Sequence, residues 1–359
     1  MLTATYSRVG SLDLKVVILV PPSVKEGTVA GVVFFHGGGM VAGHRREYFP
    51  WVVGPSSPRP FLPHHTPHHT EHVPPESAHA KGLIFLSADH RLIHPSTGSD
   101  IIADVRALFT FLASPSFSPT HLPPGVHLDP GRLAVIGLSG GGYAARAAGL
   151  YASPSPRAVY LLYAMGGDFL SDHWLRFKEP DESLGPHDSK PTWDAVKHLL
   201  EDDPAPAAEA PVVDAQGTPD PSGRLRLFAW LWRTGSLLDH VLGAPLSAHL
   251  RRLPKPARLA AVPAHLRPLL LETQIGYGFP PTFLLHGGAD PVVPVEESRA
   301  TYAALRGAGV EVEMEVLEGA PHGLMESYAP VRFVAGAEEA QERGMGFVAR
   351  FLGGPGARL

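Results

Sequence analysis

Short apolar runs recur along the chain and are separated by longer amphipathic stretches. The runs are rich in β-branched and aromatic residues, and they are apolar throughout rather than alternating with polar residues. Such runs are typical of strands that are buried on both faces of a parallel sheet. These predicted strands cover Gly31–Phe35, Gly82–Ala88, Leu133–Ile136, Ala158–Ala164 and Thr282–Leu285. We also predict a strand at Val310–Leu317.

Two segments at the start of the chain alternate between apolar and polar residues. Thr3–Val9 and Leu12–Val20 flank a turn at Gly10-Ser11, and Pro21 ends the second segment. We therefore expect an antiparallel hairpin ahead of the parallel strands.

Helical periodicity fills the intervals between the buried strands. Asp100–Ala113 has an acidic start, Gly140–Ala152 is rich in small residues, and Glu296–Ala308 and Ala337–Leu352 are amphipathic. Because strands and helices alternate, the sequence predicts an α/β fold with a mostly parallel central sheet and helices on both faces.

A first interruption of this rhythm is rich in proline and histidine. It covers Gly54–Lys81 and includes HHTPHHTEH at His64–His72. A metal site and a solvated loop are both conceivable, and the loop is favoured because histidines among prolines have no fixed geometry. We therefore expect no metal and leave the role of residues 64–72 open.

A second interruption, Met165–Phe279, is too long for a plain crossover between two strands. It contains helix-like segments at Trp193–Glu201 and Leu225–Leu242. We interpret residues 165–279 as a helical cap inserted into a catalytic core formed by residues 1–164 and 280–359. Trp230 and Trp232 either pack inside this cap or contact substrate, and they are our candidate substrate-binding residues together with Leu138.

Composition excludes several classes of protein. The chain is 18% charged with a net charge of −5 and carries no Lys/Arg run, so we expect no nucleic-acid partner. It has no cysteine, which excludes disulfides and thiolate metal sites. The longest apolar runs are about eight residues, against the roughly 20 that a spanning helix needs. Met1–Gly10 does not resemble a signal peptide. We expect a cytoplasmic protein without a membrane span, and a homodimer stays open.

The strongest chemical motif is Gly137–Gly141, which reads GLSGG and fits G-x-S-x-G. A predicted strand leads into it and a predicted helix leaves it. A serine on such a sharp turn projects its hydroxyl above the sheet, and the helix that follows directs its first amides toward a developing oxyanion. We therefore predict Ser139 as a nucleophile.

A serine hydroxyl needs a base, and the base needs an acid that orients it. His322 lies in a loop after the last predicted strand, and Asp290 follows the strand Thr282–Leu285. The chain order of serine, aspartate and histidine is the one expected when the nucleophile stands on a strand–turn–helix elbow. Asp168 is a weaker alternative for the acid.

Besides the serine, histidine and aspartate, the candidate active site includes a glycine turn. His36–Gly39 (HGGG) directly follows the predicted strand Gly31–Phe35. Backbone amides of Gly37 and Gly38, joined by that of Gly140, would stabilise the negative oxygen of a tetrahedral intermediate. The chain has no P-loop motif and no G-x-G-x-x-G, so a nucleotide-binding turn is disfavoured.

These motifs resemble the hormone-sensitive-lipase-like branch of the α/β-hydrolases, whose members are mostly carboxylesterases. The resemblance is carried by HGGG at 36–39, GLSGG at 137–141, Asp290-Pro291 and His322-Gly323, and by DHRL at 89–92 followed by Asp104. It implies an α/β-hydrolase fold and covers residues 12–164 and 280–352, not the cap. The family usually has G-D-S-A-G at the nucleophile, where this chain has Leu138 and Gly140, and a tyrosine where this chain has His90.

The resemblance implies a serine hydrolase that cleaves a carboxylic ester through an acyl-enzyme, without a cofactor. The tryptophans and leucines of the predicted cap suggest a hydrophobic substrate of small to medium size. An acyltransferase, deacetylase or amidase with the same triad would share this acyl-enzyme and stays open. A non-catalytic ligand-binding protein on the same scaffold, like the plant gibberellin receptors, is disfavoured because all the candidate catalytic residues are present.

Overall fold

The computed structural model describes residues 1–47, 78–185, 188–201, 204–213, 219–328 and 331–353. The Pro/His-rich stretch at 54–81 falls almost entirely outside these ranges, as does the histidine run at 64–72. Within the described residues, no helix is both long enough and apolar enough to cross a membrane.

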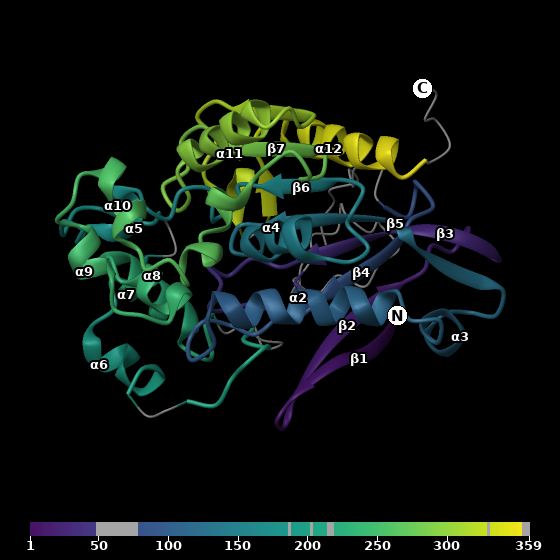
Figure 1. The fold of residues 1–359 in the computed structure, drawn as a ribbon, viewed down its shortest axis with the longest axis horizontal. Helices are drawn as coiled ribbons and strands as arrows, with labels where there is room; N and C mark the ends of the chain where they lie inside the picture. Colours follow the sequence, from purple (N-terminus) through teal and green to yellow (C-terminus); the bar gives the residue numbers. More distant parts are fainter. Residues whose placement is uncertain (48–77, 186–187, 202–203, 214–218, 329–330, 354–359) are drawn as a thin grey trace.

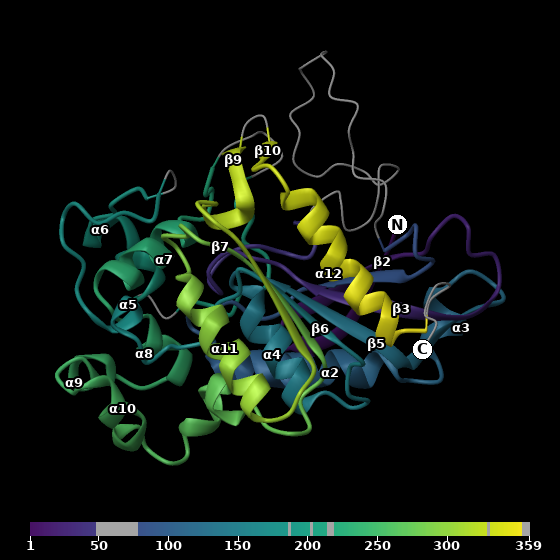
Figure 2. The ribbon, with the colours of Figure 1, turned by 90° about the horizontal axis from the view of Figure 1, so that it is seen from above.

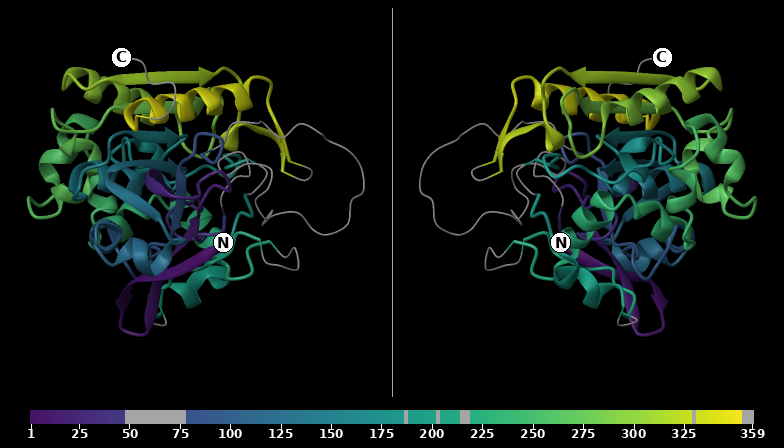
Figure 3. Two further views of the ribbon diagram at one scale, coloured as in Figure 1. Left: turned by 90° about the vertical axis from the view of Figure 1, so that its right-hand side faces the viewer. Right: turned by 90° about the vertical axis from the view of Figure 1, so that its left-hand side faces the viewer.

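A mostly parallel sheet forms the centre of the molecule (Figure 1). Its strand order is β1-β2-β4-β3-β5-β6-β7-β8, with β1 and β2 pairing antiparallel and the strands from β4 to β8 all parallel. Figure 3 shows the β1–β2 hairpin and β8 on opposite edges. The strands are β1 (Leu2–Val9), β2 (Leu12–Leu19), β3 (Gly27–Phe35), β4 (Ile84–Ala88), β5 (Val126–Leu138), β6 (Val159–Leu162), β7 (Thr282–Gly287) and β8 (Val312–Leu317).

The central strands are apolar on both faces because each face has its own core. In β3, Val33 and Phe35 belong to one buried cluster, while Val32 and Phe34 belong to the other. Each such fully buried side chain contributes roughly 1.5–3 kcal/mol relative to exposure. The continuous apolar runs in the sequence therefore correctly predicted strands that lie between two helical layers.

Helices cover both faces of the sheet (Figure 2). Residues of α2 (Gly98–Leu112), α4 (Gly141–Tyr151) and α11 (Val295–Gly307) contribute to one core, and those of α12 (Ala337–Phe351) to the other. A short helix, α3 (Phe117–His121), was not predicted from the sequence. The α/β fold class and the four core helices were predicted correctly.

The segment between β6 and β7 is made of short helices that gather at one end of the sheet (Figure 1). They are α5 (Asp172–Leu175), α6 (Trp193–Val196), η1 (Lys197–Leu199), α7 (Arg224–Arg233), α8 (Leu237–Leu242), α9 (Ser247–Leu250), α10 (Lys255–Ala261), η2 (Arg267–Leu269) and η3 (Leu271–Gln274). We call residues 165–279 the inserted segment. Its role as a cap stays a prediction.

One element of the inserted segment was predicted wrongly. The pattern at Leu225–Leu242 indicated a single helix, but the chain turns between α7 and α8 at Gly235. Gly235 has φ +59°, and a Cβ at this position would lie 2.3 Å from the carbonyl oxygen of Leu175. The close approach of another backbone segment therefore ends the first helix.

The strand β8 is the last strand of the sheet, and the chain that follows it leads to α12, which packs on one face of the sheet. A short 3₁₀ turn, η4 (His322–Leu324), is followed by the antiparallel pair β9 (Met325–Tyr328) and β10 (Val331–Phe333) and then by α12. This small pair was not predicted, because it is short and lies outside the central sheet.

Candidate active site

Ser139 stands on the sharp turn between β5 and α4. Its φ of +50° is rare for a residue with a side chain and stores local strain. Three backbone hydrogen bonds hold it there: its N–H donates to Leu162 at 3.0 Å, and its carbonyl accepts from Gly142 and Met165, both at 2.9 Å. The turn therefore presents the side chain of Ser139 at the carboxyl end of the sheet, as the motif predicted.

The side chains of Ser139, His322 and Asp290 form one continuous chain of contacts. Ser139 Oγ lies 3.0 Å from His322 Nε2, and His322 Nδ1 lies 2.6 Å from Asp290 Oδ2. The first pair is 183 residues apart in the sequence. Both distances are within hydrogen-bond reach, and the imidazole lies between the hydroxyl and the carboxylate.

Asp290 is held rigidly and kept ionised. Its Oδ1 accepts backbone N–H groups of Val292 at 2.8 Å and Val293 at 2.9 Å. Burial of the carboxyl raises the pKa of Asp290, but the proximity of His322 and hydrogen bonding from His286 outweigh it and hold that pKa well below its usual range. A carboxylate that stays charged can stabilise an imidazolium formed beside it.

Asp168, the alternative acid, makes a different contact. Its Oδ2 forms an ion pair with Lys255 Nζ, whose side chain is 57% exposed. The histidine that contacts Ser139 therefore has Asp290 as its carboxylate partner, and Asp168 links two parts of the inserted segment.

The glycine loop, which we define as residues 37–42, lies directly against the nucleophile turn. Gly38 has φ +98°, and its carbonyl accepts the amides of Val41 at 3.1 Å and Ala42 at 2.9 Å, which closes the loop into a tight turn. A Cβ at Gly37 would lie 3.5 Å from Ser139 Cβ. The structure thus brings Gly37 and Gly38 beside Ser139.

Gly140 completes the contact between the two turns. A Cβ at this position would lie 2.4 Å from the amide nitrogen of Met40 and 2.8 Å from that of Gly39. The glycine loop and the start of α4 therefore touch backbone to backbone, which explains a glycine where the resembled motif has alanine. The oxyanion role of Gly37, Gly38 and Gly140 stays a prediction. Gly39 also lies next to Gly140.

Solved structures share this architecture over nearly the whole chain. The esterase Est2 of Thermogutta terrifontis, with propionate bound, superposes with a TM-score of 0.51 and 20% identity, covering 98% of this chain and 92% of that chain. A protein of unknown function from Staphylococcus aureus superposes with a TM-score of 0.58 and 15% identity, covering 98% and 100%. The chain therefore has an α/β-hydrolase fold.

Sequence relatives of this chain fall into several groups. The prolyl oligopeptidase family model matches residues 276–337, which include Asp290 and His322. The non-reducing polyketide synthase pkbA of Emericella nidulans is 25% identical over 343 residues, 88% of this chain and 12% of that protein. The probable carboxylesterase M8 of a Phoma species is 32% identical over 168 residues, 44% of this chain and 45% of that protein.

The chain spans between 10% and 12% of the length of the three synthases that it matches first. These comparisons do not single out the hormone-sensitive-lipase-like branch, so membership of that branch stays a prediction.

The candidate substrate-binding residues lie in different surroundings. Leu138 is 8% exposed, and a Cβ at Gly37 would lie 3.0 Å from its Cδ2. Trp232 is 2% exposed, and its Nε1 donates to His173 Nε2 at 3.0 Å. Trp230 is half-buried, with its ring 5.7 Å from that of Trp193. Their contact with substrate stays a prediction.

Two side chains missed by the sequence analysis touch the triad. The ring of Tyr163 meets that of His322 edge-on at 4.9 Å. His286 Nε2 lies 3.4 Å from Asp290 Oδ2, and its Nδ1 lies 2.7 Å from Ser298 Oγ. His286 begins the HGGADP sequence that contains Asp290, and this proximity was the available signal.

The DHRL motif supports the glycine loop. The ring of His90 stacks on that of His36 with 4.8 Å between centroids and 7° between planes. Burial lowers the pKa of both histidines, so two uncharged rings stack without repulsion. Arg91 Nε donates to Asp104 Oδ1 at 2.9 Å, which ties the motif to α2.

A buried charged cluster lies behind the nucleophile turn. Arg146 Nη2 donates to Thr301 Oγ1 at 2.9 Å, and its Nη1 donates to the carbonyl of Met165. Burial lowers the pKa of Arg146 to about 10, raises that of Glu272 to about 8 and raises that of Glu297. Since Met165 in turn donates to the carbonyl of Ser139, this cluster supports the turn from within the core.

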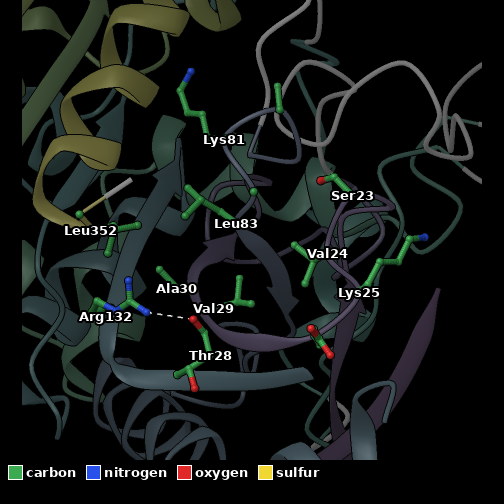
Figure 4. A pocket seen from close by; sticks show the side chains of 14 residues that line it. Ser23, Val24, Lys25, Thr28, Val29, Ala30, Lys81, Leu83, Arg132 and Leu352 are labelled. Carbon is green, nitrogen blue, oxygen red and sulfur yellow. Dashed lines mark hydrogen bonds between the residues drawn. The ribbon is translucent and has the colours of Figure 1, made fainter. Parts of the chain in front are cut away.

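Other features of the described residues lie away from the triad. Among these residues, no three His, Cys, Asp or Glu side chains come together as a metal site would require. A pocket of about 600 Å³ contains Lys25, Lys81 and Arg132 (Figure 4). It is lined by the start of β3, at the opposite end of the parallel strands from Ser139.

Proposed function

We propose that this α/β-hydrolase cleaves carboxylic esters, with Ser139 as nucleophile, His322 as general base and Asp290 as the acid that orients it. The observation that carries the proposal is the unbroken contact from Ser139 Oγ through the imidazole to a buried, ionised carboxylate. The glycine loop packed against Ser139 supports the proposal, because its backbone amides are candidate donors to an oxyanion.

The proposed cycle has two displacements. His322 Nε2 takes the proton of Ser139 while Oγ attacks the ester carbonyl, and the imidazolium then returns this proton to the leaving alcohol as the carbon–oxygen bond breaks. Water attacks the acyl-enzyme by the same route and releases the carboxylic acid. Amides of Gly37, Gly38 and Gly140 donate to the negative oxygen of both tetrahedral intermediates.

Acyl transfer is a second candidate, and one observation favours it. The chain resembles segments of non-reducing polyketide synthases over most of its own length, 88% in the case of pkbA. An acyl-enzyme on Ser139 would form equally well from a thioester, and an alcohol in place of water would give transfer rather than hydrolysis.

The inserted segment is proposed as the cap that selects the substrate. Its tryptophans and leucines would favour a hydrophobic acyl or alcohol group of small to medium size. Activity that is unchanged in Trp230→Ala and Trp232→Ala, across short and long esters, would contradict a role for these two side chains.

The test begins with a fluorophosphonate probe, which labels an activated serine. We expect labelling of the wild type and none of Ser139→Ala. A series of p-nitrophenyl esters of increasing chain length then measures hydrolysis, and added alcohols or thioester donors measure transfer. Absence of both labelling and turnover in a folded wild type would overturn the proposal.

A further inference from the structure

The glycine loop is tied to the inserted segment by a buried arginine. Arg224, the first residue of α7, is 4% exposed. Its Nε donates to the carbonyl of Val41 in the glycine loop, and its Nη2 donates to the carbonyls of Ile93 at 2.8 Å and His94 at 2.7 Å. One guanidinium therefore joins α7 to two separate loops of the core.

The same helix supplies a second contact one turn further on. A Cβ at Gly39 would lie 2.4–2.8 Å from three carbon atoms of the Phe228 ring, so this ring packs directly against the backbone of the loop. Phe228 is itself 6% exposed and meets the Trp174 ring edge-on at 6.4 Å. Arg224 and Phe228 thus hold opposite ends of the turn formed by residues 39–41.

The core also restrains this turn. One backbone link on the core side is the hydrogen bond from the Ile93 amide to the carbonyl of Met40 at 2.9 Å. Arg224 binds the carbonyl of the same Ile93, so its loss would loosen both sides of the turn together. Burial lowers the pKa of Arg224 only to about 10, which leaves the guanidinium charged near neutral pH and its hydrogen bonds strong.

We propose that Arg224 and Phe228 are positioning residues for the oxyanion hole, so that helix α7 of the inserted segment sets the geometry of the glycine loop. The inference rests on the proposed function in that the loop stabilises an oxyanion. It implies that a change in the inserted segment alters the rate of the chemical step as well as the choice of substrate.

The test compares Arg224→Met with Arg258→Met. Arg258, on α10, is also 4% exposed and also donates to backbone carbonyls, those of Leu250, Leu253 and Leu170. Both substitutions keep the apolar stem and remove a buried guanidinium, so both should lower stability. Only the first removes a bond to the glycine loop. Arg224→Lys serves as the milder variant because it can restore one hydrogen bond.

Hydrogen exchange of peptides covering residues 36–44 measures how often the glycine loop opens, because the amides of Val41 and Ala42 are hydrogen-bonded within it. We expect faster exchange there in Arg224→Met, an intermediate rate in Arg224→Lys and the wild-type rate in Arg258→Met. Equal exchange in the two methionine variants would overturn the proposal, whether or not the enzyme hydrolyses esters.

Enzyme kinetics and inhibitor binding test whether the oxyanion is less well stabilised in the variants. In Arg224→Met we expect kcat to fall about 10- to 100-fold with KM nearly unchanged, less than the loss of a whole donor group. Affinity for a trifluoromethyl ketone, which forms an oxyanion on the serine, should fall by the same factor, and Arg258→Met should change neither. A fall shared by both variants would overturn the positioning role. A wild type that neither reacts with the fluorophosphonate probe nor hydrolyses esters would instead refute the proposed function. The hydrogen-exchange data would then still test whether Arg224 holds the glycine loop.

Discussion

Gly140→Ala isolates the contact between the nucleophile turn and the glycine loop. Gly140 has φ −54°, a conformation that alanine adopts readily, so the substitution adds no backbone strain. The added methyl group would instead lie 2.4 Å from the Met40 nitrogen and 3.0 Å from the Gly39 carbonyl carbon. Both are backbone atoms and cannot rotate away.

The size of the effect follows from these distances. The added Cβ would lie 2.4 Å from the Met40 nitrogen, and an ordinary contact of about 3.4 Å therefore requires the glycine loop to move away by roughly 1 Å. A displacement of this size at a catalytic group can cost about 10²-fold in rate. We therefore expect kcat to fall about 100-fold, while the crowding lowers the free energy of unfolding by about 1–3 kcal/mol.

The assay measures kcat and KM on a p-nitrophenyl ester together with urea unfolding. Gly346→Ala is the matched control, because Gly346 is exposed in α12 and a Cβ there meets nothing within 4 Å. It should keep wild-type kcat and raise the free energy of unfolding by about 0.5–1 kcal/mol. If Gly140→Ala retained kcat within about threefold of the wild type, the position of the glycine loop would not control the chemical step.

Three further outcomes are expected. Asp290→Asn should lower kcat by roughly 10³–10⁴ because the imidazole loses its orienting carboxylate, whereas Asp168→Asn should keep activity. Steady-state kinetics measure both variants, and a larger loss of kcat in Asp168→Asn than in Asp290→Asn would exclude Asp290 as the acid. Burial raises the pKa of Glu272 to about 8, so its contribution to stability is complete below the unfolded value of about 4.5 and is lost as pH rises through 8. Glu272→Gln should thus flatten the decline in melting temperature between about pH 5 and pH 8, and an unchanged slope would contradict this. Gly344→Ala would place a Cβ 2.3–2.7 Å from the Tyr160 ring and should cost about 1–3 kcal/mol in urea unfolding without changing kcat per folded molecule; full stability would show that α12 can shift.

The sequence predicted the sheet and the residues Ser139, Asp290 and His322 that the structure brings into contact, because both depend on local patterns. A strand buried on both faces must be apolar throughout, and a nucleophile turn needs small residues around Ser139. Asp290 and His322 could be selected because the carboxyl ends of parallel strands meet at one edge of the sheet. Residue types alone could not divide Leu225–Leu242, since its break depends on a carbonyl of Leu175 elsewhere in the fold.

What the sequence by itself determined is therefore the order of the central strands and the four core helices along the chain, the α/β class and the identity of the three residues that meet. Only the tertiary structure decided how the glycine loop is held. Arg224 and Phe228 reach it from a helix that follows it by more than 180 residues, and Gly140 is required by backbone atoms on another turn. Such contacts are set by the packing of distant backbone segments, and no local periodicity or motif spacing records them.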